Sequence, residues 1–496
     1  MMSIKLGRHL FTTLFVGAGL AVGCGSAFSQ SFAESPPNNA AFAPYATANN
    51  LPVYANDASL ESRISSLEAA LKKKQDKPDS KKGFTRVIDG RVYFDSYNVS
   101  SQKGSSTGIG SLSGGNNSYN GLRDLRVGVK GEGYDVFDYK VDLCFIEQTG
   151  VTNNNAATNL KDVWFGVKNV PLLEYVRIGH YRLEDGVSVL TGGTNTTFFE
   201  FDGRDFATGR RIGISSRHLW AKDTIRFFAG FFYDRDIAAR SRFNRDEDQG
   251  SIMNFRLTFL PYASRDAGGK IDGKKLLFFG GNYSYYDLSK SSNGATSASF
   301  NERFGTLQLD PLSNLTTIAT DSYNKFGLEF VYQNTAFTLQ SETYANVYNS
   351  VALSGSTRDR TVWGTYVTAK YFLTGDYRKF SADNAAWGGV SLKHNLDLRK
   401  INDLNRAEWI GALELAVKWA YTDTSDLYDS NAPIGGTSGR FTGSVNDVTV
   451  GLNWYWTPQA RWLFDYIHVI PSQQRGNLGR DHSDTDIFAA SFRYNF

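Results

Sequence analysis

The end of the chain, FAASFRYNF, alternates between apolar and polar positions. In steps of two, one face of this segment carries Phe496, Tyr494, Phe492, Ala490 and Phe488. The other face carries Asn495, Arg493, Ser491 and Ala489. A period of two predicts a β-strand with one apolar face. The strand could belong to a soluble sandwich, whose core covers that face, or to a membrane barrel, whose lipid covers it.

The same alternation recurs along the chain beyond Gly83. It predicts strands at 86–99, 121–131, 136–147, 160–168, 174–181, 210–218, 223–233, 251–262, 273–287, 323–333, 336–349, 360–373, 409–422, 444–457, 460–470 and 484–496. These are sixteen strands, and single-chain bacterial barrels have an even number.

The connections between these strands also alternate, in length. Tight links such as GYDV, QNTA and TPQA exchange with long polar segments at 100–120, 182–209, 288–322 and 423–443. Short turns at one rim and long loops at the other are typical of a transmembrane barrel. The exception is 374–408, a long link on the short-turn side, which would give eighteen strands if it added a hairpin to the wall.

Charged residues keep to one face of nearly every predicted strand. The apolar parity holds Val127, Val129, Val141, Leu143, Phe145, Phe227, Phe231, Phe255, Leu257, Leu415 and Val417. The opposite parity holds Arg91, Asp95, Asp124, Arg126, Lys140, Asp142, Arg177, Arg211, Arg226, Arg256, Glu342, Glu414, Lys418, Arg461, Asp465 and Arg493. So many ions cannot line a dry core, whereas they can line a water-filled lumen. Aromatic residues near strand ends fit interface girdles; examples are Trp164, Tyr233, Trp454, Trp456, Trp462 and Tyr494.

The first part of the chain carries targeting and linker signals. Residues 1–29 read as a secretory signal, with Lys5 and Arg8 before an apolar run and small residues before the cleavage site. A competing interpretation makes Cys24 a lipidated first residue. Residues 30–58 read as a flexible linker and 59–75 as a short coiled coil, because Leu60, Ile64, Leu67 and Leu71 follow a heptad rhythm. The barrel domain is expected over 84–496.

Composition narrows the function classes. The chain has 53 Lys and Arg residues and 50 Asp and Glu residues, and 51 and 50 remain after the expected signal is removed. This nearly neutral net charge favours neither nucleic-acid binding nor a strong preference for anions or cations. Only Cys144 then remains, so no intramolecular disulfide can form. After the signal, no stretch of the chain comes close to the roughly eighteen consecutive apolar residues that a membrane-spanning helix needs. The histidines show no zinc-site spacing, and neither a cofactor motif nor a catalytic pair stands out; an enzyme is not expected.

Three segments together resemble the phosphate-selective porin family, that of porin O and porin P. They are VRIGHYRLEDGVSVLTGGTNTTFFE with the following GRRIGI, then YFLTGDYRKF, then VGLNWYWTPQARWLFDYIHV. The resemblance covers roughly 84–496. It implies an outer-membrane location, a sixteen-stranded barrel in a lipid bilayer, a homotrimer, a third loop folded into the pore, and an arginine-lined route for phosphate. The coiled coil would then lie in the periplasm.

The family's arginines carry over only in part. The motif that resembles an Arg-Arg pair in phosphate-binding members is Arg123-Asp124 here, and Arg182 stands where the family has Lys. Arg210 and Arg211 match the arginines at the exit of the third loop. The ion pathway expected from parity and resemblance together consists of Arg91, Arg123, Asp124, Arg126, Arg177, Arg182, Arg210, Arg211, Arg226 and Arg256. We expect Asp124 to compete with anions for Arg123 and Arg126.

Two interpretations of the arginines remain open. They form a ladder of forked donors for a passing oxyanion such as phosphate, or they pair with Asp95, Asp142, Asp162, Glu342 or Glu414 in a general-diffusion pore. The other classes are a structural or adhesive barrel plugged by its own loops and an outer-membrane hydrolase. Conductance distinguishes the plugged barrel from a porin.

Overall fold

The computed structural model describes eleven stretches of the chain. They are residues 83–101, 118–147, 159–221, 223–234, 249–290, 296–302, 313–353, 356–400, 409–427, 443–473 and 484–496. The expected signal, linker and coiled coil lie outside the described residues, and so does the end of the segment 374–408. Those assignments stay predictions.

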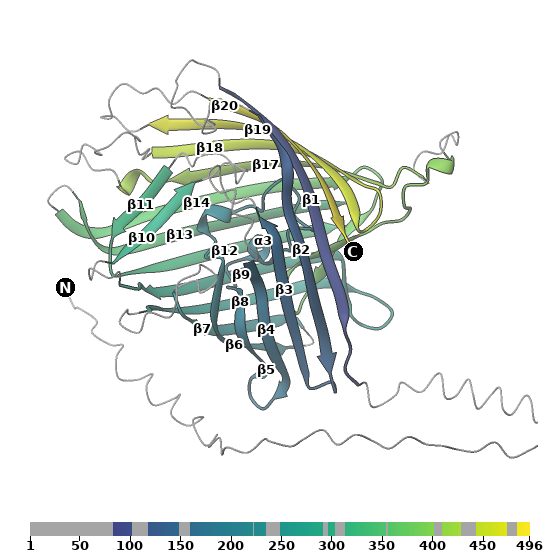
Figure 1. Ribbon diagram of the computed structural model, residues 1–496, viewed down its shortest axis with the longest axis horizontal. Coiled ribbons are helices and arrows are strands. Elements are labelled where there is room, and N and C mark those ends of the chain that lie inside the picture. The colour runs from purple at the N-terminus through teal and green to yellow at the C-terminus, as the bar shows by residue number, and fades with distance from the viewer. Residues whose placement is uncertain are drawn as a thin grey trace, which may run out of the picture. The chain divides into compact units, whose positions relative to one another are not determined.

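Sixteen antiparallel strands form one closed barrel (Figure 1). In barrel order they are β1 (Val87–Ser101), β2 (Ser118–Gly133), β3 (Phe137–Glu147), β4 (Asn159–Val170), β5 (Glu174–Arg182), β6 (Arg210–Trp220), β7 (Ile225–Phe232), β8 (Ser251–Arg265), β9 (Ile271–Asp287), β12 (Ser322–Asn334), β13 (Phe337–Leu353), β14 (Ser356–Phe372), β17 (Ala412–Asp423), β18 (Gly443–Tyr455), β19 (Ala460–Gln473) and β20 (Thr485–Asn495). Each corresponds to one predicted strand, with ends that differ by a few residues. The predicted fold class is confirmed.

Pairing of β20 with β1 closes the barrel. Gly90 and Phe496 exchange two backbone hydrogen bonds of 3.0 Å, each N–H donating to the other's carbonyl. A Cβ on Gly90 would meet the ring of Phe496 at 2.2 Å. Because Gly90 has no side chain, the ring of Phe496 can occupy the space that a Cβ atom would fill.

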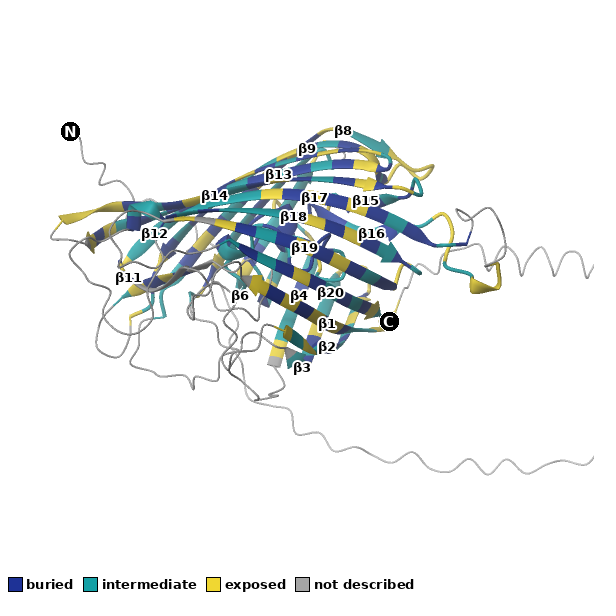
Figure 2. Cartoon of the chain, turned by 90° about the horizontal axis from the view of Figure 1, so that it is seen from above, coloured by how far each residue is buried: buried dark blue, intermediate teal, exposed yellow. Residues whose placement is uncertain are grey.

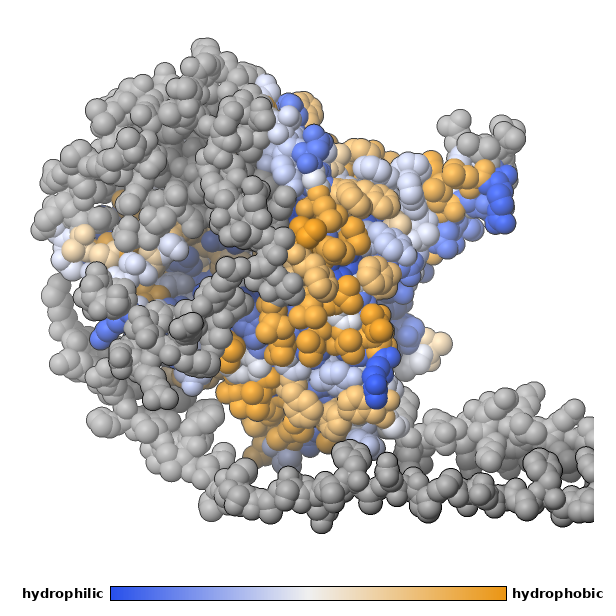
Figure 3. Space-filling model, in the orientation of Figure 1, coloured by the Kyte–Doolittle hydropathy of each residue, from blue (hydrophilic) through white to orange (hydrophobic). Residues whose placement is uncertain are grey.

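The two faces of the wall follow the predicted parity. Outward residues such as Leu257 and Val417 are 54% and 45% exposed, whereas inward Arg256 and Glu414 are 1% and 0% exposed. Buried and exposed residues alternate along the strands in Figure 2. Apolar side chains gather on the outer face of the strands turned to the viewer in Figure 3. The prediction that Trp164 belongs to an interface girdle is wrong. Trp164 lies opposite the inward residue Lys140 in the pairing of β3 with β4, and it lines an internal cavity.

This parity predicts selective labelling. In a Cys144→Ser background, Arg126→Cys should react with a membrane-impermeant thiol reagent and Val127→Cys should not, because the first side chain faces the lumen and the second faces lipid. Mass spectrometry of the labelled protein in vesicles measures both. Preferential reaction at position 127 would contradict the assignment.

Two further hairpins stand apart from the wall. β10 (Ser297–Glu302) pairs with β11 (Ser313–Ala319), and β15 (Tyr377–Ser381) pairs with β16 (Ala386–Ser391). The second confirms a hairpin in 374–408, but it forms its own sheet, so the eighteen-strand alternative is wrong. Phe380, Ala385 and Trp387 of this hairpin are buried in an apolar cluster with wall residues from β8, β9 and β12. The hairpin's apolar side chains thus pack inside the barrel and are not available to extend the wall.

The helices of the described residues are short. They are α3 (Val187–Leu190) and 3-10 turns at Arg204–Phe206, Leu398–Lys400 and Ser425–Leu427. Within the described stretches, no helix has the length and apolar character to cross a bilayer.

Candidate functional site

The connection from β5 to β6, residues 183–209, crosses the lumen and is called L3 below. The first half of L3 binds strands β7 and β12 of the wall. Glu184 forms an ion pair with Arg226 of β7, and Asp185 lies 2.9 Å from the Nζ atom of Lys325 on β12. The backbone N–H of Val187, where α3 begins, donates to Glu329 Oε2 at 3.0 Å. These groups are buried, so L3 is tied to β7 and β12 by charge-assisted bonds out of water.

The second half of L3 binds the last strands. Arg493 of β20 donates to the carbonyl oxygens of Gly193 at 2.8 Å and Phe199 at 2.6 Å. Arg461 of β19 donates to the carbonyl oxygen of Thr196 at 2.6 Å. Both arginines hold the loop by its backbone. L3 is therefore fixed at both sides of the lumen.

The tip of the β15–β16 hairpin binds three arginines. The carbonyl oxygen of Asp383 accepts from Arg217 at 2.9 Å and from Arg226 at 2.7 Å. Arg256 donates to the carbonyl oxygen of Ala385 at 2.9 Å and also forms a bidentate pair with Glu329. The predicted pathway residues Arg226 and Arg256 thus bind a hairpin and two carboxylates, and neither lines the cavities described next.

Three adjoining cavities follow the wall of β1 to β5. The rim cavity, about 460 Å³, surrounds the β2–β3 turn; the wall cavity has about 330 Å³ and the loop cavity, beside L3, about 180 Å³. Lys140 and Trp164 line both the rim and wall cavities. Four residues are shared by the wall and loop cavities: Arg91, Arg126, Arg182 and Gly193. The cavities thus form a series from the short-turn rim to L3.

The wall and loop cavities carry an excess of positive charge. Their nine basic lining residues are Arg91, Arg123, Arg126, Lys140, Arg177, Arg182, Arg204, Arg210 and Arg493. Their five acidic lining residues are Asp124, Asp142, Asp162, Glu184 and Glu200. The excess of four positive charges lies in a confined space, where screening by water is weak.

Many of these cations are paired with carboxylates. Asp124 lies between Arg91, at 2.7 Å, and Arg126, at 2.8 Å. Asp124 therefore forms the ion pair with Arg126 that the expected competition requires. Arg123 forms its own ion pairs with Asp95, at 3.2 Å, and with Glu200 of L3.

A β-bulge explains how Arg123 reaches the lumen. Tyr93 of β1 pairs with Asp124, and Phe94 pairs with Leu122, so Arg123 is an extra residue in β2. A bulge turns two successive side chains toward the same face. Strict alternation would have put either Arg123 or Asp124 in lipid.

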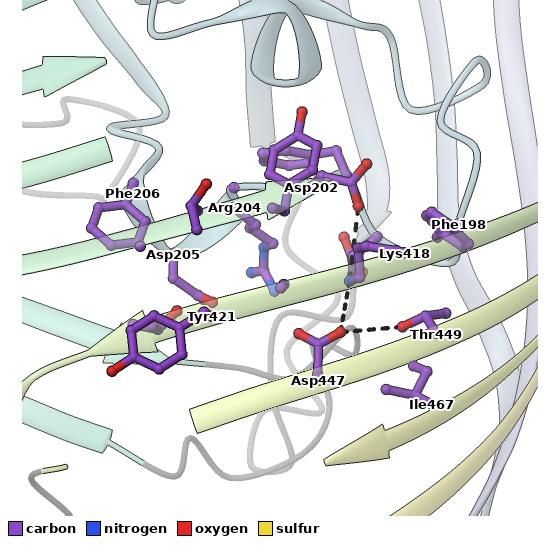
Figure 4. Close-up of a pocket in the computed structure, with 18 of the residues that line it drawn as sticks. Phe198, Asp202, Arg204, Asp205, Phe206, Lys418, Tyr421, Asp447, Thr449 and Ile467 are labelled. Carbon is purple, nitrogen blue, oxygen red and sulfur yellow. Dashed lines mark hydrogen bonds and ion pairs between the residues drawn. The ribbon is translucent and has the colours of Figure 1, made fainter. Parts of the chain in front are cut away.

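A fourth, smaller cavity lies on the other side of L3 (Figure 4). There, the Nζ atom of Lys418 lies 3.2 Å from Asp447 and 3.8 Å from Asp202, and Asp447 also accepts a hydrogen bond from Thr449. Its volume is about 60 Å³, smaller than that of the other three cavities. Among the described residues, these larger cavities therefore lie on the β1 to β5 side of L3.

The structure brings most of the predicted pathway set together. Seven predicted residues line the wall and loop cavities: Arg91, Arg123, Asp124, Arg126, Arg177, Arg182 and Arg210. Arg211 donates to the carbonyl oxygens of Thr208 and Arg210 and is outside both cavities. The sequence-based set omitted Lys140, Arg204, Arg493 and Trp164. Parity already placed Lys140 and Arg493 in the lumen, whereas no periodic signal marks Arg204 within a loop.

Comparison with known proteins identifies the family. The model of the family "Phosphate-selective porin O and P" matches residues 110–496. The chain belongs to this family. The porin is accordingly an outer-membrane channel protein, and family and fold are those of a channel and not of an enzyme.

Several solved structures of outer-membrane proteins match the chain at low identity. The outer membrane channel DcaP of Acinetobacter baumannii is 10% identical, with 84% of this chain and 98% of that chain covered and a TM-score of 0.47. The anion-selective porin from Comamonas acidovorans is 10% identical over 83% and 100% of the chains, with a TM-score of 0.47. OmpT of Vibrio cholerae in its trimer form is 12% identical over 84% and 100%, with a TM-score of 0.45. No curated protein matches the porin in sequence.

Proposed function

We propose that the porin conducts small anions along the series of cavities on the β1 to β5 wall, with a modest preference over cations. The observation that carries the proposal is the excess of four positive charges around the wall and loop cavities. A fixed charge of one sign in a narrow pore raises the local concentration of ions of the opposite sign. The preference is modest because Asp124, Asp162 and Glu200 neutralise several of the guanidinium groups.

The zero-current potential of the porin in a planar bilayer tests this proposal. With a KCl gradient across the membrane, the potential should have the sign set by chloride and a size below that of a perfectly anion-selective pore. A potential set by potassium would overturn the anion preference. Ion current with no preference would favour a general-diffusion pore.

Phosphate should bind weakly to the wild-type route. Asp124 holds Arg91 and Arg126, so phosphate must separate two ion pairs before it can use them. Asp124→Arg should remove this competition, swing the local charge by two units, and make chloride current sensitive to millimolar phosphate. Asp397→Arg, in an exposed pair with Arg399 outside the cavities, is the matched control with the same change of two units. Block of the wild type by micromolar phosphate would contradict this interpretation of Asp124.

We also propose a homotrimer. Two heptads with Leu60, Ile64, Leu67 and Leu71 are marginal as a single helix and require partner helices. Unboiled samples should run near three times the monomer mass on gels, and the double variant Ile64→Asp with Leu67→Asp should weaken that band. A purely monomeric species in mild detergent would contradict the trimer.

A plugged structural barrel is the second candidate. The observation that favours it is the filled half of the lumen, where L3 and the β15–β16 hairpin pack against β7 to β14. Absence of ion current from the folded wild-type protein would support this candidate against a channel.

A further inference from the structure

Arg177 of β5 differs from the paired arginines of the route. Its guanidinium carbon lies 4.1 Å from the ring centroid of Trp164, and the rings of Tyr181 and Tyr175 follow at 5.3 Å and 5.4 Å. Its Nε donates to the hydroxyl of Tyr175 at 3.1 Å. No described carboxylate lies within ion-pair distance of Arg177. Aromatic faces attract a guanidinium without neutralising it.

The outer edge of this guanidinium is available to a ligand. Neither Nη atom of Arg177 has a hydrogen-bond partner among the described residues, and neither is among the buried unpaired atoms. Arg177, Trp164 and Tyr181 all line the wall cavity. Stacking on Trp164 restricts the motion of the Arg177 guanidinium, so less conformational entropy is lost when its two parallel N–H donors bind an oxyanion. A planar carboxylate matches that fork with two parallel hydrogen bonds.

The rest of the wall cavity suits a ligand with an apolar body. Leu190 of L3 lines it together with Trp164 and Tyr181, and its volume of about 330 Å³ is in the range of small-molecule sites. A phosphate dianion needs several converging cations. The other cations of the wall cavity are engaged: Arg91 and Arg126 pair with Asp124. Lys140 and Arg210 pair with Asp162, and Arg182 donates to the carbonyl oxygen of Val189. A monocarboxylate needs only one guanidinium group with two free N–H donors.

We propose that Arg177, with Trp164, Tyr181 and Leu190, forms a binding site for small organic carboxylates, and that this site gives the route a preference for them over inorganic phosphate. The proposal rests on the proposed function, because the site lies within the same anion route.

Ion current through the wild-type porin provides the test, with benzoate and inorganic phosphate as separate probes. Benzoate should reduce chloride current at lower concentration than phosphate. Arg177→Gln should raise the half-blocking concentration of benzoate by about tenfold, since a charge-assisted pair is lost. Arg177→Lys should recover only part of the block. The matched control is Arg358→Gln on β14, which removes the same charge from an exposed ion pair with Asp426, and it should leave benzoate block unchanged.

The outcomes are distinguishable. Equal block by benzoate and phosphate in the wild type, a comparison that requires no variant, would overturn the carboxylate site while chloride current continues to support the anion route. Persistence of benzoate block in a conducting Arg177→Gln porin would overturn the site as well. Absence of any ion current from folded wild type would overturn the proposed function, and this site with it.

Discussion

A porin whose β15–β16 hairpin is shortened should conduct severalfold more current than the wild type. Arg378 pairs with Val390 across the hairpin, so a two-residue Asn-Gly turn can replace residues 379–389 and keep both strand ends in register. The replacement removes Phe380, Trp387 and the tip that binds Arg226 and Arg256. It retains the buried pair of Arg378 with Glu414. Water and ions would then enter the half of the lumen that the hairpin fills.

The anion preference should rise in the same variant, because Arg217, Arg226 and Arg256 lose the carbonyl partners at Asp383 and Ala385 and face the widened pore. Single-channel recordings and zero-current potentials measure the two effects. Lys379→Ala, an exposed position on the same hairpin, should change neither and serves as the control. Unchanged conductance in a shortened variant that shows wild-type heat-modified mobility would contradict the assignment of the hairpin to the lumen.

The variant Glu329→Gln should lower the free energy of unfolding by about 3 kcal/mol, the lower end of the cost of breaking a buried ion pair, because Arg256 keeps only its longer contact with Glu184 at 3.6 Å. Both side chains of the Glu329 and Arg256 pair are 0% exposed. Glu329 also accepts the backbone N–H of Val187, so the substitution weakens an anchor of L3. Denaturant titration of the porin in lipid vesicles, followed by tryptophan fluorescence, measures the change.

A second substitution separates the charge effect from loss of packing. The double variant Arg256→Met with Glu329→Gln should recover part of the loss, since the buried cation that has lost its closer carboxylate is gone. Asp397→Asn, whose partner Arg399 is 90% exposed, should show no measurable change. A single variant as stable as wild type would show that water reaches Arg256.

The strand pattern was readable from the sequence because lipid and water impose opposite demands on alternate side chains. This physical constraint repeats in every strand, so even weak periodicity located all sixteen. The bulge at Arg123 was not readable, because one inserted residue only shifts the parity locally. The sequence predicted the hairpin 377–391 but not its position inside the barrel. Apolar residues that pack against the inside of the wall and apolar residues that face lipid have the same composition, so the sequence does not distinguish them.

The candidate site was predictable to the extent that strands position it. Arg91, Arg126 and Arg177 follow from parity, whereas the partners of each arginine depend on L3 and on contacts across the barrel. Glu184 and Glu329, which hold Arg226 and Arg256, lie 42 and 73 residues away along the chain. Residue spacing therefore gives no signal that separates arginines that anchor a loop from arginines that line the route.

The hydrogen bonds between L3 and the last two strands constrain the order of assembly. Arg461 and Arg493 belong to β19 and β20, and they hold the carbonyl oxygens of Gly193, Thr196 and Phe199. L3 can therefore form its full set of hydrogen bonds only after β19 and β20 have joined the wall. We expect the final docking of L3 to accompany or follow closure of the barrel, and a defect in L3 to weaken the seam between the first and last strands as well as to alter ion flow.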